Sequence, residues 1–355
     1  MTAAPQPLDV PGATAAYLTV YALAWALHFP CAAYVLAGAG TVAFEELTGV
    51  RTRAGAALRD WLPFALGATI TTGVAPLVFV QVLYPESFYS ANLLLRAHWA
   101  AVVPLLVALF YLLYAIKGAR FAARGRAARA ALTLGVFAGF VAVAGLWTGN
   151  HVLSLAGPQA WVERYGASPL AALPSGIAPR LVLWLAVAPP FAAAIVAWQR
   201  DGATDARARA EWRAMAAVAG AGLLVAMVVA ALLAREHAGA LARARGLPLL
   251  FPAGALVQAL AWVAVARSAR AGPAARRALA LGLAPAVLGL AAAREALRLD
   301  ALADAELLAA HRRVATGAGA AIFVVLFLVC GALIAWCVRT VRRRPRAATS
   351  GPAGV

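Results

Sequence analysis

The sequence predicts an all-α integral membrane protein, a bundle of about nine transmembrane helices, on three observations. First, 64% of the 355 residues are hydrophobic and only 13% are charged, whereas a soluble domain carries roughly 25% charged residues. Second, the apolar residues form stretches of about 20 residues or more, the length that spans a bilayer. Third, basic residues gather in alternate connections between these stretches. The composition excludes an ordinary soluble domain.

Each apolar stretch is assigned to one membrane-spanning helix. The chain is expected to divide into an N-terminal outer tail (1–17), a transmembrane helical domain (18–340) and a disordered basic cytoplasmic tail (341–355). The expected spans are 18–44, 61–83, 97–116, 130–153, 178–197, 213–234, 248–266, 275–293 and 314–338.

The basic residues predict the orientation. The connections after the first, third, fifth and seventh spans carry basic clusters, and the C-terminal segment contains "VRTVRRRPR". By the positive-inside rule these segments face the cytoplasm. We therefore expect a multi-pass protein of the bacterial cytoplasmic (inner) membrane, with its N-terminus outside and its C-terminus in the cytoplasm. Because the net charge of +17 alternates with the spans and forms no single basic face, no nucleic-acid partner is expected.

The histidines all fall away from the predicted cytoplasmic connections. His98 opens the third span, His151 closes the fourth, and His28 lies inside the first. Glu295 and Arg298 stand at the outer end of the eighth span, in "LGLAAAREALRLD". An ionisable group in a membrane is costly and faces a partner or a cavity, and imidazole and carboxylate can ligate haem or non-haem iron. We expect one layer of ligand-capable groups in the outer leaflet.

Each histidine in this layer also has a plainer interpretation. His28 could make a hydrogen-bonded packing contact in place of a metal bond. His98, beside Arg96 and Trp99, fits the polar and aromatic belt at a membrane interface. His151 could line a site without ligating a metal. The sequence does not distinguish which of His98 and His151 would be the second ligand.

Glu295 likewise could form a salt bridge with Arg294 or Arg298 instead of binding iron. His237 and His311 adjoin loops and charged residues, and both are expected on the solvated surface.

Two stretches in the first two spans resemble motifs of a known family. The stretch "WALHFPCAAYVLAGAGTVAFEE" contains His28 and a run of small residues that ends in Glu45, and "FALGATITTGVAPLVFVQVLY" follows at 64–84. Both resemble subunit I of the cytochrome bd-type terminal oxidases. The resemblance places His28 at a haem-ligand position, and His98 at or near the Glu that ligates the high-spin b haem in the family.

Two later stretches extend the resemblance. "LWTGNHVLSLAG" is similar to a family helix that ends in A-A-N-S-W-M-Q, with Asn150 matching the Asn. "AAAREALR" keeps the Glu-to-Arg spacing of the family motif A-E-x-G-R-Q-P-W through Glu295 and Arg298, and it lacks the Q-P-W. The resemblance implies that Glu295 ligates haem or iron, with Arg298 beside a propionate or carboxylate.

The chain also departs from the family. The connection "REHAGALARARGLP" between the sixth and seventh spans is too short for the family's quinol-binding loop, the fifth span has no His, and the seventh has no Met. The quinol site and the low-spin haem are therefore expected to be absent.

The resemblance thus implies a haem-binding membrane subunit of a cytochrome bd-like respiratory oxidoreductase. It would pass electrons to a small acceptor, most simply oxygen, at an outer-leaflet site with one or two haems of b type or a related type. The implied partners are the lipid membrane, a second membrane subunit and a c-type cytochrome donor. The implied metal ligands are His28, His98 and Glu295; the implied cofactor-binding residues add His151 and Arg298; and the implied catalytic residues are Glu295, Arg298 and Asn150.

Two other functions stay open. The missing low-spin ligands and quinol loop are also what a non-catalytic membrane anchor or electron-relay subunit of a larger respiratory complex would show. A transporter is a weaker alternative: Pro189 and Pro190 interrupt the fifth span, and broken helices mark transport sites, but the chain shows no internal repeat.

Overall fold

The computed structural model describes residues 12–165, 176–199, 205–301 and 318–343. Every regular element in these ranges is a helix, so the prediction of an all-α protein is confirmed. The contacts divide the chain into two units, Met1–Val314 and Ala315–Val355. The second unit contains α15 (Ala318–Arg343), on which large apolar side chains such as Leu328 and Trp336 are exposed.

Eight helices of the first unit are long and apolar enough to cross a membrane. Each overlaps one predicted span, and several extend beyond it by up to about two turns. The ninth predicted span, 314–338, begins outside the described residues; it overlaps α15, whose apolar part is the shorter segment Val324–Thr340. The long helices are α1 (Gly12–Thr48), α2 (Arg53–Leu83), α5 (Val102–Lys117), α7 (Arg126–Ser154), α9 (Ile177–Gln199), α10 (Ala206–Glu236), α12 (Leu250–Ser268) and α13 (Pro273–Ala301). The short ones are α3 (Pro85–Leu95), α4 (Ala97–Ala100), α6 (Ala119–Ala122), α8 (Gly157–Tyr165), α11 (Ala238–Arg243) and the 3-10 turn η2 (Leu247–Leu249).

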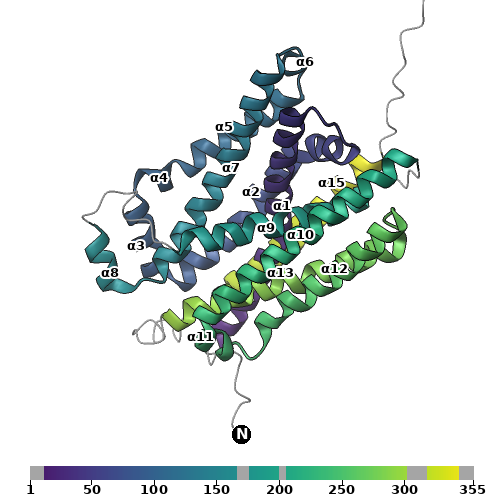
Figure 1. Ribbon diagram of the computed structural model, residues 1–355. Helices are drawn as coiled ribbons and strands as arrows, with labels where there is room; N and C mark the ends of the chain where they lie inside the picture. Colours follow the sequence, from purple (N-terminus) through teal and green to yellow (C-terminus); the bar gives the residue numbers. More distant parts are fainter. Residues whose placement is uncertain (1–11, 166–175, 200–204, 302–317, 344–355) are drawn as a thin grey trace, which may run out of the picture. The chain divides into compact units, whose positions relative to one another are not determined.

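Helix α1 is the element around which the first unit is built (Figure 1). It packs against α2, α7, α9 and α13, while α12 packs against α10 and α13. The core between α1 and α9 is aromatic: the rings of Trp25 and Phe29 stack at 4.7 Å, and Phe29 meets Phe191 edge-on at 5.6 Å. Such pairs add to the stabilisation that their buried area provides.

Glycines let α12 and α13 approach each other closely. A Cβ at Gly289 would lie 2.1 Å from the backbone nitrogen of Phe251, and a Cβ at Gly254 would lie 2.5 Å from the carbonyl oxygen of Gly282. Close backbone contact through small residues is a main source of helix association in membranes. Through this contact α12 holds α13, and with it the charged residues near the C-terminal end of α13.

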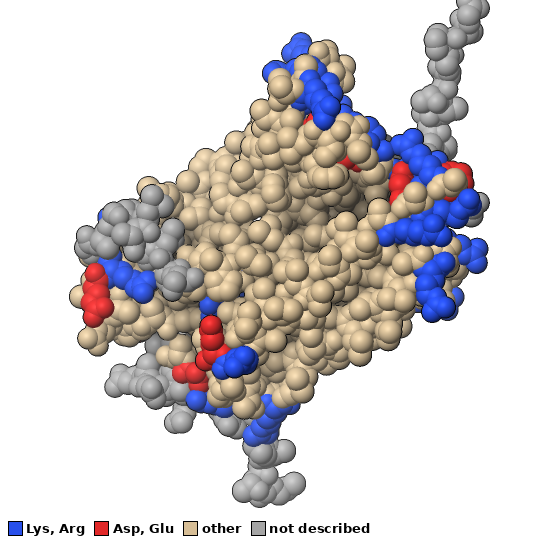
Figure 2. Space-filling view, viewed as in Figure 1, with Lys and Arg blue, Asp and Glu red and all other residues tan. Residues whose placement is uncertain are grey.

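A network of charged groups holds one end of the first unit together. Glu46, which is 1% exposed, accepts two hydrogen bonds from Arg51 at 2.8 Å and one from Nε of Arg129 at 2.9 Å. Nearby, Arg53 pairs with Asp205 at 2.8 Å. The α1–α2 connection and the starts of α7 and α10 therefore meet at one end, where Figure 2 shows many of the Lys and Arg side chains. The alternation of basic clusters along the sequence is also a clustering in space.

Candidate functional site

Glu295 and Arg298 form a buried ion pair near the C-terminal end of α13. The two residues are 3% and 2% exposed, and NH1 of Arg298 donates to Oε1 of Glu295 at 2.9 Å. Residues three apart share a helix face, so the spacing seen in the sequence produces the contact. The contact leaves two buried polar atoms of the pair, Oε2 of Glu295 and Nε of Arg298, without a direct hydrogen bond to another side chain in the geometry of the described residues.

A second arginine and a tyrosine extend this pair towards α1. The hydroxyl oxygen of Tyr21, a residue that is 1% exposed, accepts from NH1 of Arg294 at 3.0 Å and from NH1 of Arg298 at 3.4 Å. A tyrosine hydroxyl neutralises no charge. Arg298 is thus paired with the carboxylate of Glu295, whereas Arg294 is bonded to the uncharged hydroxyl of Tyr21. A charge in a membrane without a counter-charge is costly.

Tyr84, at the junction of α2 and α3, closes the cluster on another side. The Arg298 guanidinium lies over its ring, 5.2 Å from the centroid, a favourable cation–π arrangement. Burial raises the pKa of Tyr84 well above its ordinary value, and the Glu295 carboxylate raises it further. The hydroxyl therefore stays protonated and remains a hydrogen-bond donor.

His151 lies on α7 at the edge of the same cluster. It is buried, its Nδ1 has no hydrogen-bond partner among the described residues, and the charges of Arg180, Arg294 and Arg298 act on its ring. The preceding residue, Asn150, is engaged elsewhere: its Nδ2 donates to Oδ1 of Asn92 on α3 at 2.7 Å. Asn150 thus fixes α7 against α3, and His151 presents a free nitrogen.

His28 lies between α1 and α2, and one of its ring nitrogens is fixed. Its Nδ1 is 3.0 Å from the carbonyl oxygen of Thr69. A carbonyl only accepts, so Nδ1 carries the proton and Nε2 keeps the lone pair. Gly73 leaves room for the ring, since a Cβ there would lie 3.0 Å from Cε1. A metal-binding histidine commonly has its other nitrogen held in this way.

The structure does not bring every predicted site residue together. His98 is exposed on α4, in the position expected of an interfacial belt residue, while His151 is the histidine beside Arg298. His311 lies outside the described residues.

His237 was expected on the solvated surface, but it is half-buried and paired. Its Nε2 accepts from NH2 of Arg180 on α9 at 3.0 Å. The lone arginine in "GIAPRLVLW" was the one signal for this contact. Tyr21 and Tyr84 were missed altogether, because tyrosine is common in apolar helices and nothing in its spacing marked either residue.

Acidification is expected to weaken the contact between α9 and the end of α10. Burial lowers the pKa of His237, and the positive charge of Arg180 lowers it further. The carboxylates of Glu236 and Asp300 raise it in part. The folded pKa therefore lies below the unfolded value of about 6.5. The neutral His237 therefore contributes to the free energy of unfolding above about pH 6.5, and this contribution is lost as the pH falls through the folded pKa. Thermal unfolding between about pH 8 and pH 5 should show this loss, reduced in His237→Gln; equal pH dependence in both proteins would contradict the assignment.

Ligand atoms in the described part of the chain are scattered. None of its His, Cys, Asp and Glu side chains form a group of three or more that could hold a metal ion. The candidate site is therefore the cluster of Tyr21, Tyr84, Arg294, Glu295 and Arg298 with His151 at its edge, and His28 lies two turns from Tyr21 on α1. Comparison of the chain with protein-family models, with curated proteins and with solved structures found no match.

Proposed function

We propose that this chain is a haem-binding membrane subunit of a respiratory oxidoreductase similar to the cytochrome bd-type oxidases. The observation that carries the proposal is the excess of positive charge around His151. The charges of Arg180, Arg294 and Arg298 all act on this ring, whereas the Glu295 carboxylate is bonded, among the described residues, to Arg298. Buried cations in a membrane are held by anionic partners, and the propionates of a haem would supply them.

The available ligand atoms suit a haem better than a bare ion. A bare ion needs three or more protein ligands, whereas the porphyrin supplies most ligands of a haem iron and the protein adds one or two. The hydrogen bond at Nδ1 of His28 leaves the lone pair on its Nε2, Nδ1 of His151 has no hydrogen-bond partner among the described residues, and Glu295 offers a carboxylate oxygen. His98, an implied ligand, is exposed, so His151 takes its place in the proposal.

The bound haem would supply electron transfer to a small acceptor such as oxygen. The side chains around it would set its charge and its surroundings. Arg294 and Arg298 would balance the anionic groups, and the Tyr84 ring would hold the Arg298 guanidinium in place. Asn150, held by Asn92, would form the wall beside His151.

We further propose the placement of the chain in the membrane. The N-terminus lies outside, α15 completes a set of nine spans, and the basic end seen in Figure 2 faces the cytoplasm of a bacterial cell. The haem site then lies nearer the outer surface. A c-type cytochrome or a second membrane subunit is the electron donor, since the chain lacks the family's quinol loop.

A non-catalytic anchor or relay subunit is the second candidate. The observation that favours it is the ion pair within α13, where Arg298 neutralises Glu295 without any cofactor. For an anchor, haem would be missing from the purified chain, whereas a relay would contain a redox group without reducing the acceptor itself.

Haem content and its dependence on His28 test the proposal. Protein purified from membranes with its co-expressed partners should show b-type bands in a reduced-minus-oxidised spectrum. The bands should be lost or shifted in His28→Ala, because Nε2 is no longer available, and added imidazole should restore them. Glu295→Gln should change the spectrum, since the amide is a weaker ligand than the carboxylate.

The exposed histidine provides the matched control. His98→Ala should leave the spectrum unchanged, and size-exclusion profiles should show all variants folded. Absence of haem from the folded wild-type complex would refute the proposal and favour the anchor, as would a spectrum that neither His28→Ala nor Glu295→Gln alters.

A further inference from the structure

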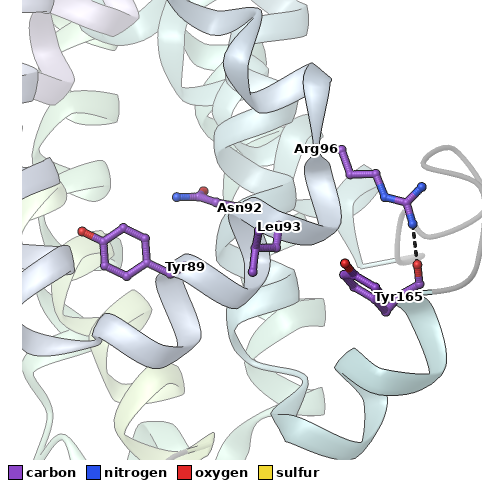
Figure 3. Close-up of a pocket in the computed structure, with 5 residues that line it drawn as sticks. All are labelled: Tyr89, Asn92, Leu93, Arg96 and Tyr165. Carbon is purple, nitrogen blue, oxygen red and sulfur yellow. Dashed lines mark hydrogen bonds between the residues drawn. The ribbon is translucent and has the colours of Figure 1, made fainter.

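A groove of about 570 Å³ lies on α3 and is distinct from the cluster described above (Figure 3). Four of its lining residues, Tyr89, Asn92, Leu93 and Arg96, come from α3 and its C-terminal cap, and Tyr165 comes from the end of α8. The α3 residues are spaced by three, four and seven positions, so they line one face of the helix. Figure 3 shows Leu93 between Tyr89 on one side and Tyr165 on the other.

One end of the groove is cationic. Arg96 ends α3 with a φ of 50°, a conformation uncommon outside glycine. Its NH2 donates to the carbonyl oxygen of Tyr165, and its guanidinium lies 5.8 Å from the centroid of the Tyr165 ring. Within the described residues this is its one hydrogen bond, so most of its five N–H groups remain available. The backbone conformation and Tyr165 thus hold the Arg96 guanidinium at this end of the groove.

The other end of the groove is apolar and held in place. Tyr89 and Leu93 are 52% and 64% exposed, one turn apart on α3. Asn92, between them in sequence, is anchored because its Oδ1 accepts from the buried Asn150 at 2.7 Å. The groove therefore joins a fixed apolar surface to a cation within roughly two helical turns, about 10 Å.

We infer that this groove binds the phosphate of a membrane phospholipid, with an acyl chain against Tyr89 and Leu93. Arginine pairs with phosphate through two parallel hydrogen bonds, and tyrosines with an exposed leucine suit the boundary between head groups and acyl chains. A free phosphate would use Arg96 and leave the apolar half of the groove in water. The inference does not depend on haem.

Lipid retention tests the inference. Delipidated protein in detergent is titrated with phosphatidylglycerol, with phosphatidylcholine and, separately, with glycerol phosphate and inorganic phosphate, and bound lipid is counted by native mass spectrometry. One phospholipid of either head group should bind, and the tail-less phosphates should not compete. Arg96→Gln should weaken binding by about ten- to a hundredfold, the effect of losing a charge-assisted hydrogen bond.

Two further variants separate this site from general attraction to basic residues. Arg120→Gln removes an exposed arginine on α6 and should leave the binding constant unchanged. Leu93→Asn keeps Arg96 but removes the apolar contact, so it should also weaken binding of the lipid. Equal losses in Arg96→Gln and Arg120→Gln would overturn the inference, as would glycerol phosphate binding as tightly as the lipid.

Discussion

Replacing Glu295 with Leu is expected to destabilise the protein by about 3–5 kcal/mol, the usual cost of removing one partner of a buried ion pair. The substitution leaves Arg298, 2% exposed, without the carboxylate to which it is bonded. The hydroxyl of Tyr21 bonds both Arg294 and Arg298 but carries no charge to offset them. Thermal or denaturant unfolding in detergent, followed by the helical signal, measures the loss.

Two controls separate the buried charge from the lost packing. The double variant Glu295→Leu with Arg298→Met removes both partners and should recover much of the stability, because an apolar pair replaces a buried ion pair at little cost. Asp205→Asn at the exposed pair with Arg53 keeps the capping oxygen and should leave the unfolding midpoint nearly unchanged, because water screens an exposed pair. If Glu295→Leu lowered the stability no more than Asp205→Asn does, Glu295 would be solvated and not buried.

Substituting Gly289 with Ala is expected to separate α12 from α13. The added Cβ would lie 2.1 Å from the Phe251 nitrogen, and a backbone atom cannot turn aside as a side chain can. We expect a loss of about 3 kcal/mol or more, at or beyond the upper end for overpacking. The fraction that stays monodisperse after heating, measured by size-exclusion chromatography, reports the effect.

Gly67 on α2 is the matched control, because a Cβ there meets no atom within 4 Å. Gly67→Ala should be neutral or stabilising by up to about 1 kcal/mol, since alanine is the better helix former. If both alanine variants survive heating equally, the close packing of α12 on α13 is not as described.

Hydropathy predicted the existence of the helices better than their ends. It placed the start of α2 at residue 61 and the end of α13 at residue 293, whereas the helices begin at Arg53 and end at Ala301. The missing turns carry charged residues, which lower hydropathy without interrupting a helix. Glu295 and Arg298 consequently lie inside α13, not beyond its end.

The contacts of the site could be predicted where the two residues are close in sequence, but not where they are far apart in sequence. The sequence offered Arg294 or Arg298 as a salt-bridge partner of Glu295, and Arg298 makes the contact because a helix brings residues three apart together. The pairing of Arg180 with His237 spans 57 residues and depends on how α9 packs against α10. The short helix α4 leaves His98 exposed, and no periodicity could indicate which way a single turn would face.

The position of Glu46 sets an order for building the protein during synthesis. Its first partner, Arg51, follows five residues later and leaves the ribosome almost with it. Arg59 arrives with α2, and Arg129 arrives 83 residues after Glu46, at the start of α7. Each new helix therefore adds a donor to a carboxylate already in place. The α1–α2 hairpin with its connection thus contains two of the arginine partners of Glu46, and α7 adds the third from far along the chain.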